Sequence, residues 1–250
     1  MSNMEFLKQN KYETTTSIKV DSNTGTVDYL MDRRLSLGYA SSGYNSTTST
    51  IISIEFGTPV VLSHVLIQNH NLKQFRGFYN SSTANSLFTT TQNSATSSYY
   101  SFASVTVSSI QLQMDDTIQG SVEKSVGEFV VSERRLQFER NPSAGNFQPK
   151  KSLTRIFHDM PDGGVTAFVI SPKFKADLSW RFVSNSMGSI LQTVYEEAKP
   201  LYFLPYPTTS AWDGQACECL WTNDFDFVYG ENSKTQGQNG SIVLRETASA

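Results

Sequence analysis

The amino-acid sequence predicts a mainly β protein, built from two β-rich domains of which the second carries one packed α-helix. Two strictly alternating runs, at residues 52–56 and 174–182, place apolar side chains on one face and polar side chains on the other, which is typical of half-buried strands. Helical spacing is clear only near residues 186–199. Close to residues 132–136 the chain turns from weakly charged β-prone runs to a charged and then loop-like segment, so we expect a domain boundary there.

Length and charge set the first limits. With 250 residues the chain can form two ordinary domains, here residues 1–135 and 136–250. The net charge of -3, with both signs interspersed, argues against a nucleic-acid partner. The first residues contain no apolar core of a secretory signal, and nowhere do eighteen apolar residues run together. We therefore expect no membrane span and synthesis in a cytoplasm.

The first domain is predicted to contain a meander of short strands. Residues 1–12 lack a period and are expected to form an arm or an edge strand that docks elsewhere. The strand at 52–56 should end at the Gly-Thr-Pro break of residues 57–59, because proline cannot donate a ladder hydrogen bond. Alternation resumes at Val65 and Ile67, and an aromatic run at 75–79 forms the third strand.

Three polar residues, Asn69, His70 and Asn71, interrupt this apolar region. Asparagine tolerates left-handed backbone and bonds its own main chain, so a tight corner is predicted. The most economical role for His70 is structural, with its ring bonding backbone groups that the corner leaves unpaired.

Two stretches rich in Ser, Thr and Asn, residues 41–50 and 80–98, are predicted to be loops. Further strands are expected at residues 100–107, 110–114 and 126–131. Long ordered loops often carry function, and aromatic rings beside them can stack on a ligand. The candidates are Tyr39, Tyr44, Tyr99 and Tyr100. The alternative is that these rings only cover the core.

The order of these motifs resembles a discoidin or galactose-binding-like β-sandwich, a jelly-roll module. The matching features are a strand ending in Phe, a Thr-Pro break, a Val/Leu/Ile strand, the sequence NHNLK, and an aromatic strand ending in Tyr-Asn. The form with the Asn-His-Asn corner is similar to modules of tailed-phage virion proteins. The resemblance covers residues 11–135. It implies that loops gather at one end, where a sugar or a protein partner docks, and it adds Asn69, His70 and Asn71 to the candidate partner-binding residues.

The second domain is predicted to open with a long β-hairpin. Its strands are residues 165–170 and 174–182, the latter with a polar row that includes Lys175, Asp177 and Arg181. The helix should be capped by Ser186 and end before Pro200, and short strands follow at 201–204, 224–229 and 241–244. This order is similar to the tube-like domains of phage distal-tail and tail-tube proteins.

No catalytic motif, phosphate-binding glycine loop or dinucleotide fingerprint occurs, so we expect neither an enzyme nor a bound cofactor. Cys217 and Cys219, two residues apart, are expected to be reduced thiols on one strand face. The histidines His64, His70 and His158 are too scattered to predict a metal site.

These observations favour a structural virion protein of a bacteriophage tail or baseplate. We expect copies of the chain to form a ring of three or six subunits, beside other virion proteins, with Lys175, Asp177 and Arg181 at the subunit interface because polar groups there fix orientation. The protein would be located in the virion. The alternative is a carbohydrate-binding module that attaches the particle to a host glycan.

Overall fold

A computed structural model describes residues 3–11, 15–30, 32, 37–42, 48–142, 147–160, 164–205, 216–229 and 237–247. The chain divides into two compact units. The first contains Met1–Gln137 and, of the later residues described, 202–205 and 216; the second contains Phe138–Leu201 and Cys217–Thr247. The division falls beside the predicted boundary, but residues 202–205 belong to the first unit although the sequence analysis assigned them to the second domain.

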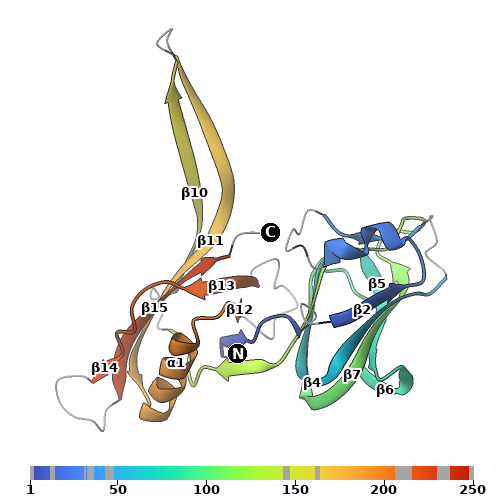
Figure 1. The fold of residues 1–250 in the computed structure, drawn as a ribbon, viewed down its shortest axis with the longest axis horizontal. Coiled ribbons are helices and arrows are strands. Elements are labelled where there is room, and N and C mark those ends of the chain that lie inside the picture. Colours follow the sequence, from blue (N-terminus) through green and yellow to red (C-terminus); the bar gives the residue numbers. More distant parts are fainter. Residues whose placement is uncertain are drawn as a thin grey trace. The chain divides into compact units, whose positions relative to one another are not determined.

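Antiparallel strands form nearly all of the first unit (Figure 1). One sheet has the order β3-β8-β4-β7-β5-β6, with β2 also paired to β4, and β1 lies between β12 and β9. The strands are β1 (Glu5–Leu7), β2 (Thr15–Val20), β3 (Tyr39–Ala40), β4 (Thr50–His70), β5 (Leu72–Tyr79), β6 (Ser82–Thr90), β7 (Ser98–Thr117), β8 (Ser125–Ser132), β9 (Arg134–Gln137) and β12 (Leu201–Leu204), with one 3₁₀ helix (Thr24–Leu30).

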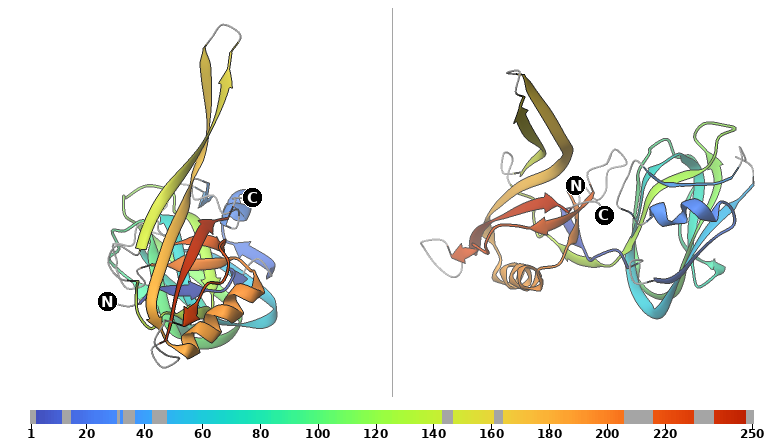
Figure 2. Two further views of the ribbon diagram at one scale, coloured as in Figure 1. Left: turned by 90° about the vertical axis from the view of Figure 1, so that its left-hand side faces the viewer. Right: turned by 45° about the horizontal axis from the view of Figure 1, so that its top comes forward.

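The two runs predicted around the Gly-Thr-Pro break are halves of one long strand, β4. The register with β7 shifts between Glu55 and Val60, and residues 57–59 are exposed there. Proline has no backbone N–H, and none is needed where a bulge interrupts the ladder. The strand therefore bends at Pro59 and continues past it. The bent strands wrap one apolar core (Figure 2).

The segment at residues 80–98 is not the single loop that the sequence predicted, because β6 occupies its first half. β6 is an edge strand paired only to β5 among the described strands. Its polar composition suits an exposed edge. Phe88 is its buried residue and packs against Gly77. A β-carbon on Gly77 would lie 2.4 Å from the Phe88 ring, so the glycine makes room for that ring.

The predicted N-terminal arm docks as strand β1. Leu7 packs with Leu66, Val130, Tyr202 and Leu204 in a second apolar cluster of the first unit. The arm therefore covers side chains that would otherwise face water, at about 1.5–3 kcal/mol for each buried aliphatic side chain.

In the second unit, antiparallel strands run in the order β10-β11-β15-β13, and β14 pairs with β15. Its strands are β10 (Phe147–Asp159), β11 (Val165–Val183), β13 (Cys217–Trp221), β14 (Val228–Tyr229) and β15 (Gln238–Glu246), and its helix is α1 (Asn185–Glu197). The predicted strand at 224–229 is thus reduced to its last two residues. The runs at residues 165–170 and 174–182, predicted to be the two strands of a hairpin, form one strand, β11, and its hairpin partner is β10. The β10–β11 hairpin projects beyond the rest of this unit (Figures 1 and 2).

The alternating pattern of β11 is confirmed up to Trp180 and then fails. Ala176, Leu178 and Trp180 are buried, and the Trp180 ring stacks on Phe138 at 4.7 Å between centroids. Phe182, predicted to be buried, has a φ of 61° and is 47% exposed, because the register with β15 shifts between Trp180 and Val183. Val183 takes the buried place instead.

Helix α1 begins two residues earlier than predicted. Ser184, and not Ser186, is the N-cap, since its hydroxyl accepts the backbone N–H of Met187. Ala198 ends the helix in a left-handed conformation. The predicted fold class is confirmed: a mainly β chain with a β-sandwich first and one packed α-helix in the part that follows.

Candidate functional site

The predicted corner at residues 69–71 is a structural element. Asn69 is exposed with a φ of 48°, as a tight corner requires. The Asn71 amide donates to the carbonyl oxygen of Glu123 at 2.6 Å and accepts from the backbone of Ser125 at 2.9 Å. Asn71 therefore holds the corner against the loop before β8.

His70 lies under this corner with 2% of its surface exposed. The Leu72 backbone N–H donates to His70 Nδ1 at 3.1 Å, so the proton is on Nε2, which lies 2.9 Å from the Ser98 hydroxyl oxygen. Burial lowers the pKa of His70 to about 4. The predicted structural role of the ring is confirmed for its bond to the backbone of Leu72, and a buried ring cannot contact a ligand directly.

Tyr39 is a core residue and not a stacking platform. Its ring is fully buried, and its hydroxyl donates to the backbone carbonyl of Ser22 at 2.8 Å. Burial raises the pKa of this phenol. Tyr44 lies outside the described residues.

The side chains of Tyr99 and Tyr100 also pack and form hydrogen bonds within the first unit. Tyr100 stacks on Phe88 with 3.9 Å between ring centroids, and its hydroxyl lies 2.5 Å from that of Thr90. Tyr99 packs on the second apolar cluster and donates its hydroxyl to the Glu5 carboxylate at 3.3 Å. For Tyr39, Tyr99 and Tyr100 the structure thus favours the alternative, that these rings cover the core.

A buried polar network links β1, β4 and β9. Glu5 Oε2 lies 3.1 Å from His64 Nε2, and its other oxygen lies 3.2 Å from the Arg134 guanidinium. Burial alone would raise the pKa of Glu5, but the hydrogen bond from His64 and the charge of Arg134 outweigh burial and lower it. Arg134, in the charged segment at the predicted domain boundary, is therefore the partner of a buried carboxylate.

Ser63 extends this network to a hydroxyl, an imidazole and a carboxylate in a row. Its Oγ lies 2.7 Å from His64 Nδ1, and it accepts the backbone N–H of Arg134 at 2.9 Å. Such rows activate nucleophiles in hydrolases. Here Ser63, His64 and Glu5 are at most 4% exposed, so the row joins strands and does not face a substrate.

The three predicted interface residues lie between Lys175 and Val183, the part of β11 that pairs with β15. Asp177 is paired within the molecule, to Lys175 at 3.2 Å and to Lys150 of β10 at 3.6 Å. Arg181 is exposed. All three side chains are at least partly accessible, as an interface requires, although Asp177 already has two partners of its own.

The distal part of the hairpin, in which the residues of β11 before Lys175 pair with β10, carries exposed apolar side chains. Phe157 is 61% exposed, Val165 62% and Met160 47%. In the described part of the chain, only β10 pairs with β11 before Lys175, and no strand pairs with the outer edge of β10. The distal hairpin is therefore a two-stranded ribbon with both edges open.

The cysteine sulfur atoms of Cys217 and Cys219 lie 3.2 Å apart and are not bonded as a disulfide. The described residues contain no group of three or more His, Cys, Asp or Glu side chains that could hold a metal ion. Among the same residues, no helix has the length and apolar character needed to cross a membrane.

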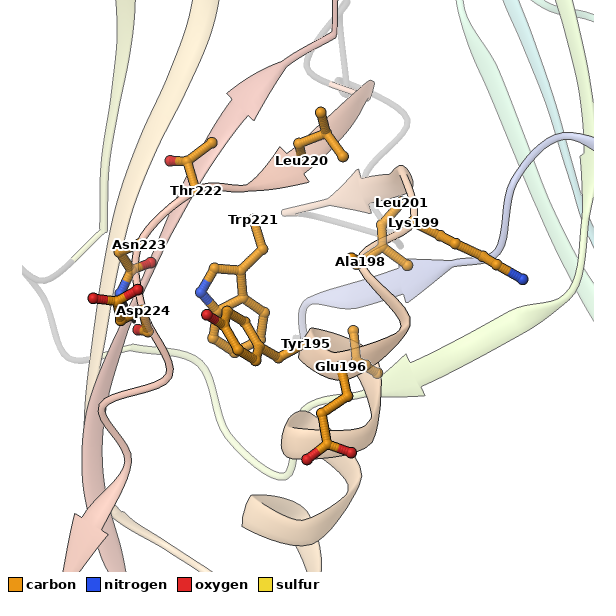
Figure 3. Close-up of a pocket in the computed structure, with 11 residues that line it drawn as sticks. Tyr195, Glu196, Ala198, Lys199, Leu201, Leu220, Trp221, Thr222, Asn223 and Asp224 are labelled. Atoms are coloured by element: carbon orange, nitrogen blue, oxygen red, sulfur yellow. Dashed lines mark hydrogen bonds between the residues drawn. The ribbon is translucent and has the colours of Figure 1, made fainter.

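A pocket of about 370 Å³ lies between the end of α1 and the end of β13, wholly within the second unit (Figure 3). Its apolar wall is formed by Val194, Tyr195, Ala198, Leu201, Leu220 and Trp221. Its polar side is formed by Glu196, Lys199, Thr222, Asn223 and Asp224. The volume is within the range of about 300–1,000 Å³ that is usual for small-molecule sites.

Aromatic rings stiffen this wall. The rings of Tyr195 and Trp221 meet edge to face at 5.4 Å, and Phe225 lies 5.8 Å from the first and 6.1 Å from the second. Phe227 lies behind Trp221 at 6.3 Å and is itself buried. No local pattern of the sequence predicts a role for Trp221, since only the fold brings it to α1.

No family model and no curated protein matches the chain. Solved structures similar to about half of it include chitosan-binding modules and a fucosidase. Chitosan-binding module 1 of a Paenibacillus sp. IK-5 chitosanase/glucanase is 12% identical, with 50% of this chain and 99% of that chain covered and a TM-score of 0.44. Module 2 of that enzyme, solved with chitotriose, is 15% identical, with 49% and 100% covered and a TM-score of 0.43.

A Ruminococcus gnavus GH29 fucosidase solved with fucose is 17% identical, with a TM-score of 0.43; 50% of this chain matches 27% of the fucosidase. The chain thus spans about a quarter of that enzyme. Likenesses of this size do not assign a ligand.

Proposed function

We propose that the protein is a structural component of a multi-subunit assembly, in which the β10–β11 hairpin joins neighbouring copies. The observation that carries this proposal is the distal ribbon, which has two open edges and exposed apolar side chains at Phe157 and Val165. From Lys175 to Val165 the strand continues for about 30 Å at 3.3 Å per residue. A two-stranded ribbon is only marginally stable alone in water, so we expect other chains to cover it.

The two open edges differ, one belonging to β10 and the other to β11. Pairing of the β10 edge of one copy with the β11 edge of the next would be a head-to-tail contact, which closes into a ring when the rotation allows. Such a contact supports a closed ring, for which we propose three or six copies. Lys175, Asp177 and Arg181, at the base of the hairpin, would then set the orientation of neighbours.

The resemblance of the corner at residues 69–71 to modules of tailed-phage virion proteins supports placing this assembly in a bacteriophage tail or baseplate. Neighbouring virion proteins would be further partners, and the protein would be made in the host cytoplasm and located in the virion. Within such a particle the role is structural and not enzymatic.

The test is the assembly state of the full chain. We expect the wild type to form closed rings by multi-angle light scattering and electron microscopy. A variant in which Asn-Gly replaces residues 154–170 should stay monomeric, because it keeps the base of the hairpin and loses the ribbon. Tyr229→Ser, an exposed change on β14, is the control and should assemble normally. Equal assembly of the shortened variant would contradict the proposal.

A carbohydrate-binding role of the first unit is the second candidate function, in which a host glycan is the partner. The exposed Asn69 is the predicted residue that best reaches solvent, while His70 and Tyr39 are buried. Glycan-array binding of the full chain, compared with Asn69→Ala, tests this role. Absence of any specific glycan would leave assembly as the function of the protein.

A further inference from the structure

We propose that the pocket between α1 and β13 is a carbohydrate-binding site that takes one or two uncharged sugar rings. This site is separate from the hairpin on which the assembly role depends, and it lies in the second unit, where no sugar site was expected. Its walls combine an aromatic platform, an unsatisfied hydrogen-bond donor and charged groups of both signs (Figure 3).

The unsatisfied donor is the indole nitrogen of Trp221. Trp221 Nε1 is buried and has no hydrogen-bond partner among the described residues. An indole N–H can only donate, and leaving a buried donor unpaired destabilises a fold. Figure 3 shows this nitrogen on the side of the ring that faces Asn223 and Asp224, along the pocket. A ligand oxygen placed there would supply the missing acceptor.

Two polar neighbours are already occupied and serve to hold the pocket in shape. The Asn223 side chain donates to the Ser241 carbonyl at 3.2 Å and accepts the Val243 backbone N–H at 2.6 Å. The Thr222 hydroxyl donates to the Val243 carbonyl at 3.1 Å. Both residues thus attach the end of β13 to β15. The other polar groups at the mouth are charged side chains: Glu196, whose carboxylate also accepts from the Gln192 amide at 2.8 Å, Lys199 and Asp224.

The charges select against anionic ligands. One lysine stands against two carboxylates, and the C-terminal end of α1 adds the negative end of its dipole. A phosphate or carboxylate ligand would therefore be repelled. A cation held by aromatic rings is also disfavoured, because the rings of Tyr195, Trp221 and Phe225 contact one another at 5.4–6.1 Å and leave no cage between them.

An uncharged sugar fits the aromatic rings and the hydrogen-bonding groups of this pocket. Its apolar C–H face can pack on the partly buried Trp221 and Tyr195 rings, its hydroxyl hydrogens can bond the Glu196 and Asp224 carboxylates, and its oxygens can accept from Lys199 and Trp221 Nε1. The platform is rigid, since Phe225 and Phe227 pack behind it. Little side-chain freedom is then lost on binding.

The test titrates the ¹⁵N-labelled full chain with three neutral disaccharides, N,N′-diacetylchitobiose, lactose and maltose, and with choline chloride as the cationic probe. The indole N–H signal of Trp221 is identified by its loss in Trp221→Phe. We expect at least one disaccharide to shift this signal in a saturable manner, and choline to leave it unchanged. Saturation by choline alone, or no response to any disaccharide at tens of millimolar, would overturn the proposal.

Variants locate the site. Trp221→Phe keeps a ring but no donor, so we expect binding, followed by backbone amide signals of the pocket, to weaken roughly 5- to 10-fold, as for one neutral hydrogen bond. Glu196→Ala changes an exposed mouth residue without disturbing the platform and should also weaken binding. Tyr229→Ala, an exposed aromatic outside the pocket, should bind as the wild type. Unchanged affinity in both pocket variants would overturn the proposal.

Discussion

His70 should make the first unit sensitive to mild acid. In the folded chain, burial lowers the pKa of His70 to about 4, whereas an unfolded histidine titrates near 6.5. A proton on Nδ1 would remove the acceptor that the Leu72 backbone N–H uses. The unfolded state therefore binds the proton first, and stability is lost as the pH falls below about 6.5 and until it reaches about 4.

The size of this loss follows from the two pKa values. At pH 5 the unfolded histidine is almost fully protonated and the folded one almost neutral. The free energy of unfolding is therefore lower at pH 5 than at pH 7 by about 2 kcal/mol because of His70. Urea unfolding of the full chain, followed by circular dichroism between pH 7 and pH 5, measures the loss. The range stops above the window in which Glu5 gains its proton, since the pKa of that carboxyl is lowered from about 4.5.

Two variants isolate the effect. His70→Gln can still accept from Leu72 and does not titrate, so we expect its loss of stability between pH 7 and pH 5 to be smaller than that of the wild type by about 2 kcal/mol. His158→Gln changes an exposed histidine of the second unit and should keep the wild-type dependence. If His70→Gln and the wild type lose stability in parallel, the buried neutral ring is not the cause and the reasoning is refuted.

Three further predictions concern packing and capping, each measured by urea unfolding. Gly77→Ala places a β-carbon 2.4 Å from a ring of β6 and should cost about 1–3 kcal/mol, whereas Gly120→Ala, with no atom within 4 Å, should cost little. Leu7→Ala should cost about 2–5 kcal/mol, and near-neutral behaviour would mean that β1 does not cover the core. Ser184→Ala should cost about 1 kcal/mol and Ser186→Ala less, and the reverse order would restore Ser186 as the cap.

Much of the fold was predictable because its signals are local. Alternation at residues 174–180 and helical spacing after Ser184 depend on neighbours within a few positions. The corner at residues 69–71 was also local, since asparagine suits left-handed backbone. Where the prediction failed, the structure was determined by pairing with a strand that is distant in the sequence. β6 is a strand because β5 offers an edge, and Pro59 sits in a bulge because β7 continues past it.

The candidate sites were harder to predict, because burial and pairing are properties of the folded chain. Tyr39 and Tyr99 stand beside polar segments, and nothing local says that their hydroxyls bond to Ser22 and Glu5. The pocket joins the end of α1 to residues 220–224, across a sequence gap with no shared motif. Its one local signal was the close spacing of Trp221, Phe225 and Phe227, which also fits an ordinary core.

The polar atom of an aromatic side chain distinguishes a structural ring from a candidate binding ring more sharply than its place on a loop does. Tyr39, Tyr99 and Tyr100 each have a hydroxyl within hydrogen-bond distance of a fixed partner, so a ligand would have to displace an existing bond. Trp180 likewise donates its indole N–H to the Arg140 carbonyl at 3.1 Å. Trp221 presents the same donor beside a pocket with no acceptor among the described residues. A ligand oxygen there would replace no bond and would satisfy one donor, so the second unit offers a better binding ring than the loops of the first.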